Sequence, residues 1–304
     1  MQKTVDYKKL VSLIAVICCM ASARAQLSPF GNGYYQDRYL LNPALCGAKE
    51  GIVVNAAYRK EQLSFSESPT SQYLTAAYGI SDKVGAGVKL EASQSGPLTH
   101  INAMASYAYH LRLTETKKIY MGLSLGVTNN HLGISKTNGE ADDPALLGYN
   151  AKGTQVDADF GAAYTDGKLL VQAAMPGLVS QYKKENKDWV NKPLAFAAVS
   201  YKVKLSEEAE GIYAEPMVAF RAVKGYDNII DAGSNFSFLG NKLAIMAMYH
   251  TNKSISAGAG LEIFDNTVSV NAIYHSTPDG LKTFSSGGIE IAVKASLGNL
   301  FKKK

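Results

Sequence analysis

Apolar residues alternate with polar or small ones along most of the chain. Between residues 119 and 128, every second side chain is Ile, Met, Leu or Val, and Tyr, Gly, Ser or Thr lies between them. A period of two is typical of β-strands, whose successive side chains point to opposite faces. The same pattern recurs at 155–164 and 289–297. It predicts an all-β protein whose strands have one apolar and one polar face.

Fourteen segments with this pattern can be counted. Most have about nine to twelve residues or slightly more, which is the length that a tilted strand needs to cross a bilayer. An even number is expected of a closed bacterial barrel. The segments lie near residues 51–59, 71–80, 83–94, 98–113, 117–131, 153–165, 168–175, 193–205, 211–222, 227–238, 242–250, 254–264, 267–275 and 286–297.

The connections between these segments alternate in length. The even-numbered ones are short and rich in turn-forming or polar residues, whereas the odd-numbered ones include the two longest, 132–152 and 176–192. Two odd-numbered connections, near 95–97 and 251–253, are short and depart from this rule. Outer-membrane barrels have tight periplasmic turns and longer outer loops. The alternation therefore places both termini on the periplasmic side.

A soluble β-sandwich is the competing architecture, because it would bury the same alternating faces. Such a fold would rarely need fourteen long strands whose short turns lie mainly at the same end. Closing the sheet also removes its edges and satisfies the backbone in lipid. The sequence favours a transmembrane outer-membrane β-barrel of about fourteen antiparallel strands.

The two faces predict different surroundings for the barrel wall. The apolar face should meet outer-membrane lipid, with a tyrosine girdle near the strand ends. These tyrosines are Tyr58, Tyr78, Tyr109, Tyr164 and Tyr249. The opposite face carries charges of both signs: Lys89, Glu91, His110, Arg112, Asp157, Asp159, Glu215, Arg221, Asp231, Glu262, Glu290 and Lys294. Because neither sign dominates, a packed, salt-bridged lumen is favoured over a permeation path.

Residues 1–25 have the features of a cleaved signal peptide. Lysines open the segment, an apolar run follows at Leu10–Met20, and Ala23-Arg24-Ala25 forms an A-x-A cleavage site. The alternative is a lipoprotein anchor at Cys18 or Cys19, but the small residue required before the cysteine is missing. Cleavage leaves Cys46 alone, so we expect no internal disulfide and a small buried residue there.

Composition narrows the class of protein further. Of 304 residues, 46% are hydrophobic and 19% are charged, which excludes a disordered chain. Mean hydropathy near zero argues against a multi-helix membrane protein. The net charge is +5, and much of it lies within residues 1–25. The rest of the chain therefore has no strong positive field that would favour nucleic-acid binding.

Catalytic chemistry is hard to find, and no cofactor or metal site is predicted. No HExxH, CxxC, GxSxG or phosphate-loop motif occurs, and the five histidines lack metal-ligand spacing. His275 with a nearby hydroxyl is a minor candidate for a membrane hydrolase. Asp142-Asp143 before a proline has too few ligands for a calcium loop. The charged loop with Lys183, Lys184 and Trp189 is a candidate contact surface for a partner, or simply a solvated loop.

The segment 26–50 does not alternate and is unusually aromatic for a linker. Its tyrosines and leucines call for burial, so it is expected to dock on or in the barrel as a plug. Residues 1–25, 26–50 and 51–304 would then be signal peptide, docked segment and barrel. The segment contains, in this order, Gln36, Tyr39, Leu40, Leu41, Asn42, Pro43, Ala44 and Gly47. With these residues it resembles the start of the PorP/SprF family of Bacteroidetes outer-membrane proteins, although Cys46 replaces a more usual Ala.

The resemblance implies a non-enzymatic role in type IX secretion or in surface anchoring of an exported protein, in some species with gliding motility. It implies as partners a periplasmic lipoprotein ring, a peptidoglycan-binding protein or a secreted surface protein. The outer loops would hold the exported protein. The alternative is a channel for a small solute, with the N-terminal segment as a hatch. The sequence assigns no residue a catalytic role.

Overall fold

The computed structural model describes residues 33–63, 68–133, 144–182, 193–206, 211–224, 227–264, 267–277 and 286–298. The predicted signal peptide, the pair Asp142-Asp143, and the loop residues Lys183, Lys184 and Trp189 lie outside the described residues. The statements below concern the described residues.

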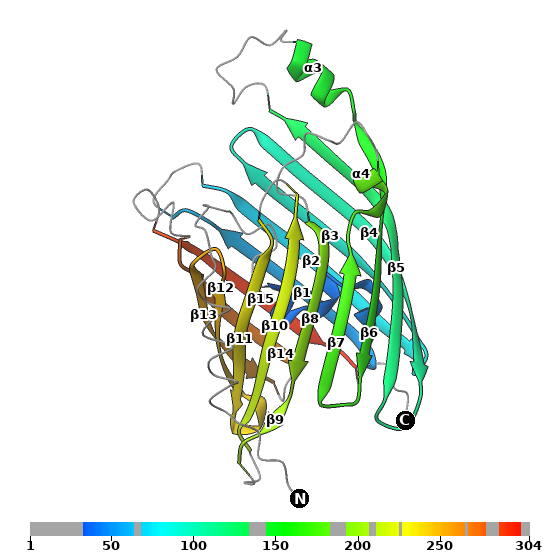
Figure 1. Cartoon of the computed structure of the whole chain (residues 1–304), viewed down its shortest axis with the longest axis vertical. Coiled ribbons are helices and arrows are strands. Elements are labelled where there is room, and N and C mark those ends of the chain that lie inside the picture. Colours follow the sequence, from blue (N-terminus) through cyan, green and yellow to red (C-terminus); the bar gives the residue numbers. More distant parts are fainter. Residues whose placement is uncertain are drawn as a thin grey trace, which may run out of the picture.

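The strands form one closed antiparallel barrel (Figure 1). Neighbours in sequence are neighbours in the sheet, and β15 pairs with β1 to close it. Because β9 only continues β8 after a one-residue break, the wall has the predicted fourteen strands. The strands are β1 (Gly51–Lys60), β2 (Thr70–Ser81), β3 (Val84–Ser95), β4 (Leu98–Arg112), β5 (Lys118–Leu132), β6 (Thr154–Thr165), β7 (Leu169–Met175), β8 (Pro193–Tyr201), β9 (Val203–Lys204), β10 (Tyr213–Val223), β11 (Ile229–Phe238), β12 (Leu243–His250), β13 (Ser254–Ile263), β14 (Val268–His275) and β15 (Gly288–Ser296).

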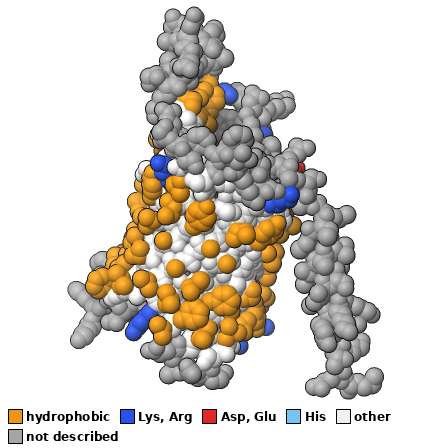
Figure 2. All heavy atoms as spheres, turned by 90° about the vertical axis from the view of Figure 1, so that its left-hand side faces the viewer, with side chains coloured by type: hydrophobic (Ala, Val, Ile, Leu, Met, Phe, Trp, Pro, Cys, Tyr) orange, Lys and Arg blue, Asp and Glu red, His pale blue; other side chains and the backbone are white. Residues whose placement is uncertain are grey.

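The outer surface of the wall carries the apolar members of each alternating pair. On β5, Leu125 is 57% exposed, whereas Ser124 beside it is 1% exposed and faces the interior. Figure 2 shows hydrophobic side chains scattered over the outer wall of the barrel. Four of the girdle tyrosines are exposed there and Tyr164 is partly exposed. This distribution, with apolar residues outside and polar residues inside, is the reverse of that in a soluble protein. A wall that faces lipid requires it.

The lengths of the connections follow the predicted alternation. The short turns β2–β3, β4–β5, β6–β7, β9–β10, β11–β12 and β13–β14 share one end of the barrel, where β1 also begins and β15 ends. We call this the short-turn end. At the long-loop end lie α3 (Pro144–Asn150) and α4 (Leu178–Tyr182) (Figure 1). Among the described helices, none is long and apolar enough to cross a membrane.

The helix α4 packs beside β6, where the neighbouring strand β7 has already ended. Strand β7 pairs only with residues 160–165 of β6, so the upper part of β6 lacks a β-strand partner on that side. The backbone N–H groups of Gly177 and Ser180 donate to the carboxylates of Asp159 and Asp157, at 2.8 and 3.1 Å. The two acidic residues predicted to face the interior thereby hold α4 in place.

Candidate functional site

The N-terminal segment occupies the lumen at about mid-height. Residues 33–48, here called the docked segment, form α2 (Gly33–Gln36) and two short turns of 3-10 helix, η1 (Arg38–Leu40) and η2 (Pro43–Leu45). Figure 1 shows them within the ring of strands. The sequence explains these turns: the side chain of Asp37 accepts from Tyr39 N and that of Asn42 from Ala44 N, both as N-caps. Proline follows Asn42 at the first helical position, where its missing N–H does no harm.

The Asn42–Ala44 turn is fitted against β5 and β6. Asn42 is fully buried, and its amide donates to Ala162 O at 3.2 Å and to the Gln172 side chain at 3.3 Å. A Cβ atom at Gly161 would lie 2.0 Å from Asn42 Oδ1. Only glycine therefore leaves room on the wall for this turn.

The substitution Gly161→Ala is expected to displace the Asn42 side chain and lower the free energy of unfolding by about 1–3 kcal/mol. The added methyl would overlap the oxygen that caps η2. Thermal unfolding in detergent, read by circular dichroism, measures the loss. Gly148→Ala is the matched control, because no heavy atom lies within 4 Å of a Cβ at that helical position. Equal stability of the two variants would contradict the fit between the turn and the wall.

Polar side chains of the N-terminal half of the barrel hold the rest of this turn region. Tyr39 donates to Ser106 Oγ at 2.7 Å. The ammonium of Lys89 donates to Leu40 O at 3.1 Å and forms a buried ion pair with Asp159 at 2.9 Å. The buried charges of Lys89 and Asp159 are thus paired with each other, as burial demands.

Further contacts hold the end of the docked segment near β1. The ring of His110 lies within hydrogen-bonding distance of Cys46 O, at 3.1 Å. Cys46 is 0% exposed, which agrees with the expectation of a small buried residue there. Gly47 packs against the backbone of Tyr78 and Gly85.

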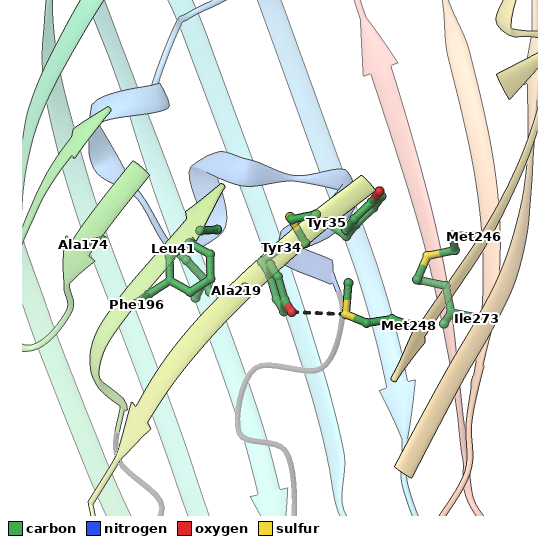
Figure 3. Close-up of a cluster of buried hydrophobic side chains, with 11 residues drawn as sticks. Tyr34, Tyr35, Leu41, Ala174, Phe196, Ala219, Met246, Met248 and Ile273 are labelled. Carbon is green, nitrogen blue, oxygen red and sulfur yellow. Dashed lines mark hydrogen bonds between the residues drawn. The ribbon is translucent and has the colours of Figure 1, made fainter. Parts of the chain in front are cut away.

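The aromatic start of the docked segment packs against the opposite half of the wall. Figure 3 shows Tyr34, Tyr35 and Leu41 in a cluster with side chains from several strands. Tyr34 meets the ring of Phe196 edge-on at 5.3 Å, and its hydroxyl donates to Asp231 at 2.6 Å. Tyr35 donates to Glu215 O at 2.6 Å. The segment therefore spans the lumen from one side to the other.

A chain of buried polar groups follows Tyr34 into strands β10 to β14. Arg221 binds Asp231 through two hydrogen bonds of 2.6 and 2.7 Å, and both side chains are fully buried. Asp231 lies 2.5 Å from His250, and the other ring nitrogen of His250 lies 2.8 Å from Ser256. Ser256 in turn lies 2.9 Å from His275. His275, the minor candidate for a membrane hydrolase, therefore lies beside the hydroxyl of Ser256.

Asp231, His250 and Ser256 are ordered like the acid, base and nucleophile of a serine hydrolase. Their surroundings do not suit that chemistry. Ser256 is 1% exposed, and its hydroxyl lies within hydrogen-bonding distance of two histidines. In this structure a substrate carbonyl could not reach that hydroxyl. The register β11–β12, which pairs Asp231 with His250, is the signal from which sequence reasoning could have found this group.

A cavity of about 680 Å³ lies between the docked segment and the short-turn end. We call it the vestibule. Its inner boundary includes Tyr35, Gln36 and Tyr39, and its outer part includes the turn residues Lys168 and Asn241. Of the family-motif residues, Gln36, Tyr39 and Gly47 line it, whereas Leu40, Leu41, Pro43 and Ala44 are buried. No group of His, Cys, Asp and Glu residues suited to a metal occurs in the part of the chain that the structure describes.

Two lysines share the vestibule, and their charges interact. The nearby ammonium of Lys294, followed by burial, lowers the pKa of Lys49 from 10.5 to about 8. Lys294→Gln is therefore expected to raise the pKa of Lys49, while Glu262→Gln, which removes an opposing charge, should lower it further. An NMR titration of ¹³C-methylated lysines measures both shifts. Shifts of the same sign in the two variants would refute this electrostatic arrangement.

Solved outer-membrane barrels share this fold at low sequence identity. The CymD monoaromatic hydrocarbon channel is 14% identical, with a TM-score of 0.51, and the match covers 90% of this chain and 94% of that one. Omp33 of Acinetobacter baumannii is 11% identical, with a TM-score of 0.49 and coverage of 82% and 99%. The toluene transporter TbuX of Ralstonia pickettii is 12% identical, with a TM-score of 0.49 and coverage of 91% and 96%. At such identities the likeness shows the fold alone, and no curated protein matches this chain.

A family model identifies the chain more specifically than its fold does. The model describes the type IX secretion system membrane protein PorP/SprF and matches residues 23–294. The match includes the docked segment, the strands β1 to β14 and β15 as far as residue 294. The resemblance stated from the motif Asn42-Pro43-Ala44 is thereby confirmed over most of the chain. This protein belongs to the PorP/SprF family of type IX secretion system membrane proteins.

Proposed function

We propose that this protein is a non-enzymatic outer-membrane barrel that supports type IX secretion or anchors an exported protein at the cell surface. The observation that carries the proposal is the family match over residues 23–294. A lumen spanned by the docked segment agrees with it, because a scaffold needs a rigid wall rather than an open pore. The buried hydrogen bonds of Asn42 and Tyr34 fix that segment on opposite sides.

In this proposal the barrel presents two different surfaces. The long-loop end, with α3 and α4 and the loop of Lys183, Lys184 and Trp189, faces outward and holds the exported protein. The short-turn end and both termini face the periplasm, where a lipoprotein ring and a peptidoglycan-binding protein would bind. The segment 26–50 acts as a plug, and the side of it that faces the short-turn end contacts those partners. Short turns inside and long loops outside are the usual arrangement in this class of barrel.

A pull-down of the tagged chain in mild detergent from the outer membrane of its native host tests this function. We expect type IX components or one large surface protein in the eluate, identified by mass spectrometry. An unrelated tagged barrel from the same membrane is the control. Recovery of the barrel alone, under conditions that preserve known complexes of that membrane, would contradict the proposal. Which partner is recovered distinguishes a core subunit from a dedicated anchor, and a partner of the motility machinery would indicate gliding.

The second candidate is a diffusion channel with the N-terminal segment as a hatch. It is favoured by the vestibule, because a cavity already lies inside the barrel on the short-turn side of the docked segment. One barrel of similar fold is described as a monoaromatic hydrocarbon channel. Single-channel recordings in planar bilayers separate the candidates. A scaffold is expected to be closed as the native protein and to conduct only when Gly161→Ala loosens the docked segment, whereas a channel conducts without that change.

A further inference from the structure

The vestibule has charged walls that the proposed function leaves unexplained. Its lining includes five basic side chains and three acidic ones. The basic ones are Arg38, Lys49, Lys168, Lys202 and Lys294, and the acidic ones are Asp37, Glu215 and Glu262. The cavity therefore has a positive balance, although the whole chain is only weakly basic.

Several of these charged groups already have partners within the protein. Arg38 forms an ion pair with Glu215. Asp37 accepts hydrogen bonds from Thr75 and from Tyr39 N. Lys202 lies over the ring of Tyr213, with 4.7 Å between its ammonium nitrogen and the ring centre. These groups hold the docked segment and the rim in place, and they are not free to bind a ligand.

Lys49 and Lys294 form a pair within the cavity, because Lys294 is the charge that acts most strongly on Lys49. Within the described ranges, neither ammonium has a carboxylate at salt-bridge distance. Lys294 points from β15 into the lumen, between Asn55 and Ser269 of the adjacent strands. Lys49 lies just before β1, on the solvent side of the docked segment. Both residues line one cavity, and the charge of Lys294 is the largest cause that lowers the pKa of Lys49.

Two neighbouring positive charges with no carboxylate of the described residues at ion-pair distance favour an anion between them. The polar side chains of Asn235, Ser269 and Asn271 line the same cavity and can donate further hydrogen bonds. Glu262 also lines it and opposes a doubly charged phosphate more than a singly charged carboxylate. A volume of about 680 Å³ is in the range of ordinary ligand pockets and exceeds what one small ion needs.

We propose that the vestibule is a binding site for a carboxylate-bearing ligand, which enters from the short-turn end and is held between Lys49 and Lys294. The carboxylate comes from an acidic segment of a polypeptide or from a free small acid, and the experiment below distinguishes these two sources. The site does not depend on the proposed function, because a scaffold and a channel would present the same cavity. It lies on the opposite side of the docked segment from the buried Asp231–His250–Ser256 group.

Isothermal titration calorimetry on the purified full-length barrel in uncharged detergent tests the site. The probes are an acetylated, amidated tetraglutamate peptide, glutarate and inorganic phosphate, with the tetraglutamine peptide as the uncharged match. We expect tetraglutamate to bind and tetraglutamine not to bind. Lys49→Gln and Lys294→Gln should each weaken tetraglutamate about tenfold or more, and added salt should weaken it further.

Lys117→Gln is the matched control variant. Lys117 lies in the β4–β5 turn at the same end, is exposed and does not line the vestibule. It removes the same charge from the same end of the barrel, so it should leave the affinity within about twofold. Heat-modified mobility on gels checks that every variant remains a folded barrel. In the native protein, bound tetraglutamate should also raise the pKa of Lys49 measured by NMR.

Each outcome has a defined meaning. Binding of tetraglutamate but not of glutarate supports a polypeptide source, and comparable binding of both supports a free acid. The proposal is overturned if no carboxylate probe binds, if phosphate binds more tightly than the carboxylates, or if Lys117→Gln weakens binding as much as Lys49→Gln. A failed pull-down would leave this result untouched, so the two proposals fail separately.

Discussion

Replacing Asp231 with alanine is expected to destabilise the barrel by about 3–5 kcal/mol, because it leaves the guanidinium of Arg221 buried without a counter-charge. Both side chains are 0% exposed, so water cannot replace the lost partner. The same substitution removes the acceptor for Tyr34 and a partner of His250. It therefore loosens the barrel wall and the docked segment together.

Thermal or urea unfolding of the purified barrel, followed by circular dichroism, measures this loss. The double variant Arg221→Met with Asp231→Leu is the informative control. It removes both charges, and apolar side chains of similar size often substitute for a buried ion pair without loss of stability. We expect the double variant to be markedly more stable than Asp231→Ala. If the two variants unfold alike, the unpaired charge is not the cause.

Replacing both Tyr39 and Leu41 with alanine is expected to release the docked segment from the lumen. The side chains are 5% and 3% exposed, and each such truncation typically costs about 2–5 kcal/mol. Tyr39 also loses its hydrogen bond to Ser106. The strands retain their own hydrogen bonds, so undocking limits the loss of stability. The clearest measurement is limited proteolysis within residues 33–48, combined with the unfolding temperature.

The matched control for this pair lies on the outer wall. Tyr107 and Leu125 are 55% and 57% exposed and face lipid or detergent. Changing both to alanine truncates one tyrosine and one leucine, as in the test variant, but leaves the lumen unchanged. We expect the control to retain a protected docked segment. An unchanged unfolding temperature and unchanged proteolysis in Tyr39→Ala with Leu41→Ala would show that the segment contributes little to the folded state.

The barrel wall could be predicted from the sequence because its signal is local. Period-two alternation determines which side chain faces outward at each position, and both faces of β5 match the expectation. The short turns that end β2, β4 and β6 are local as well. The number of strands and their antiparallel order could therefore be predicted from the same pattern. The fourteen predicted segments correspond to the observed strands, with β8 and β9 together forming one of them.

The interior could not be read in the same way, because its contacts join residues far apart in the chain. Alternation places Lys89 and Asp159 inside, but it does not reveal that they pair across the two intervening strands, β4 and β5. Lys49 and Lys294 come together only because β15 closes on β1. The role of Asp157 as an anchor for α4 depends on the early end of β7, which no local pattern marks.

The way in which the docked segment crosses the lumen also constrains the order in which the barrel is assembled. Its contacts reach progressively later parts of the chain, with sequence separations of 64 for Cys46 with His110, 130 for Asn42 with Gln172 and 197 for Tyr34 with Asp231. A partly formed sheet that ends at β7 can already bind Asn42, whereas Tyr34 finds its acceptor only after β11 is added. Because the segment binds strands that form early, we expect it to dock while the sheet is still growing, before β15 meets β1. In that order of events the segment is a template for the curvature of the sheet, rather than a plug inserted into a finished barrel.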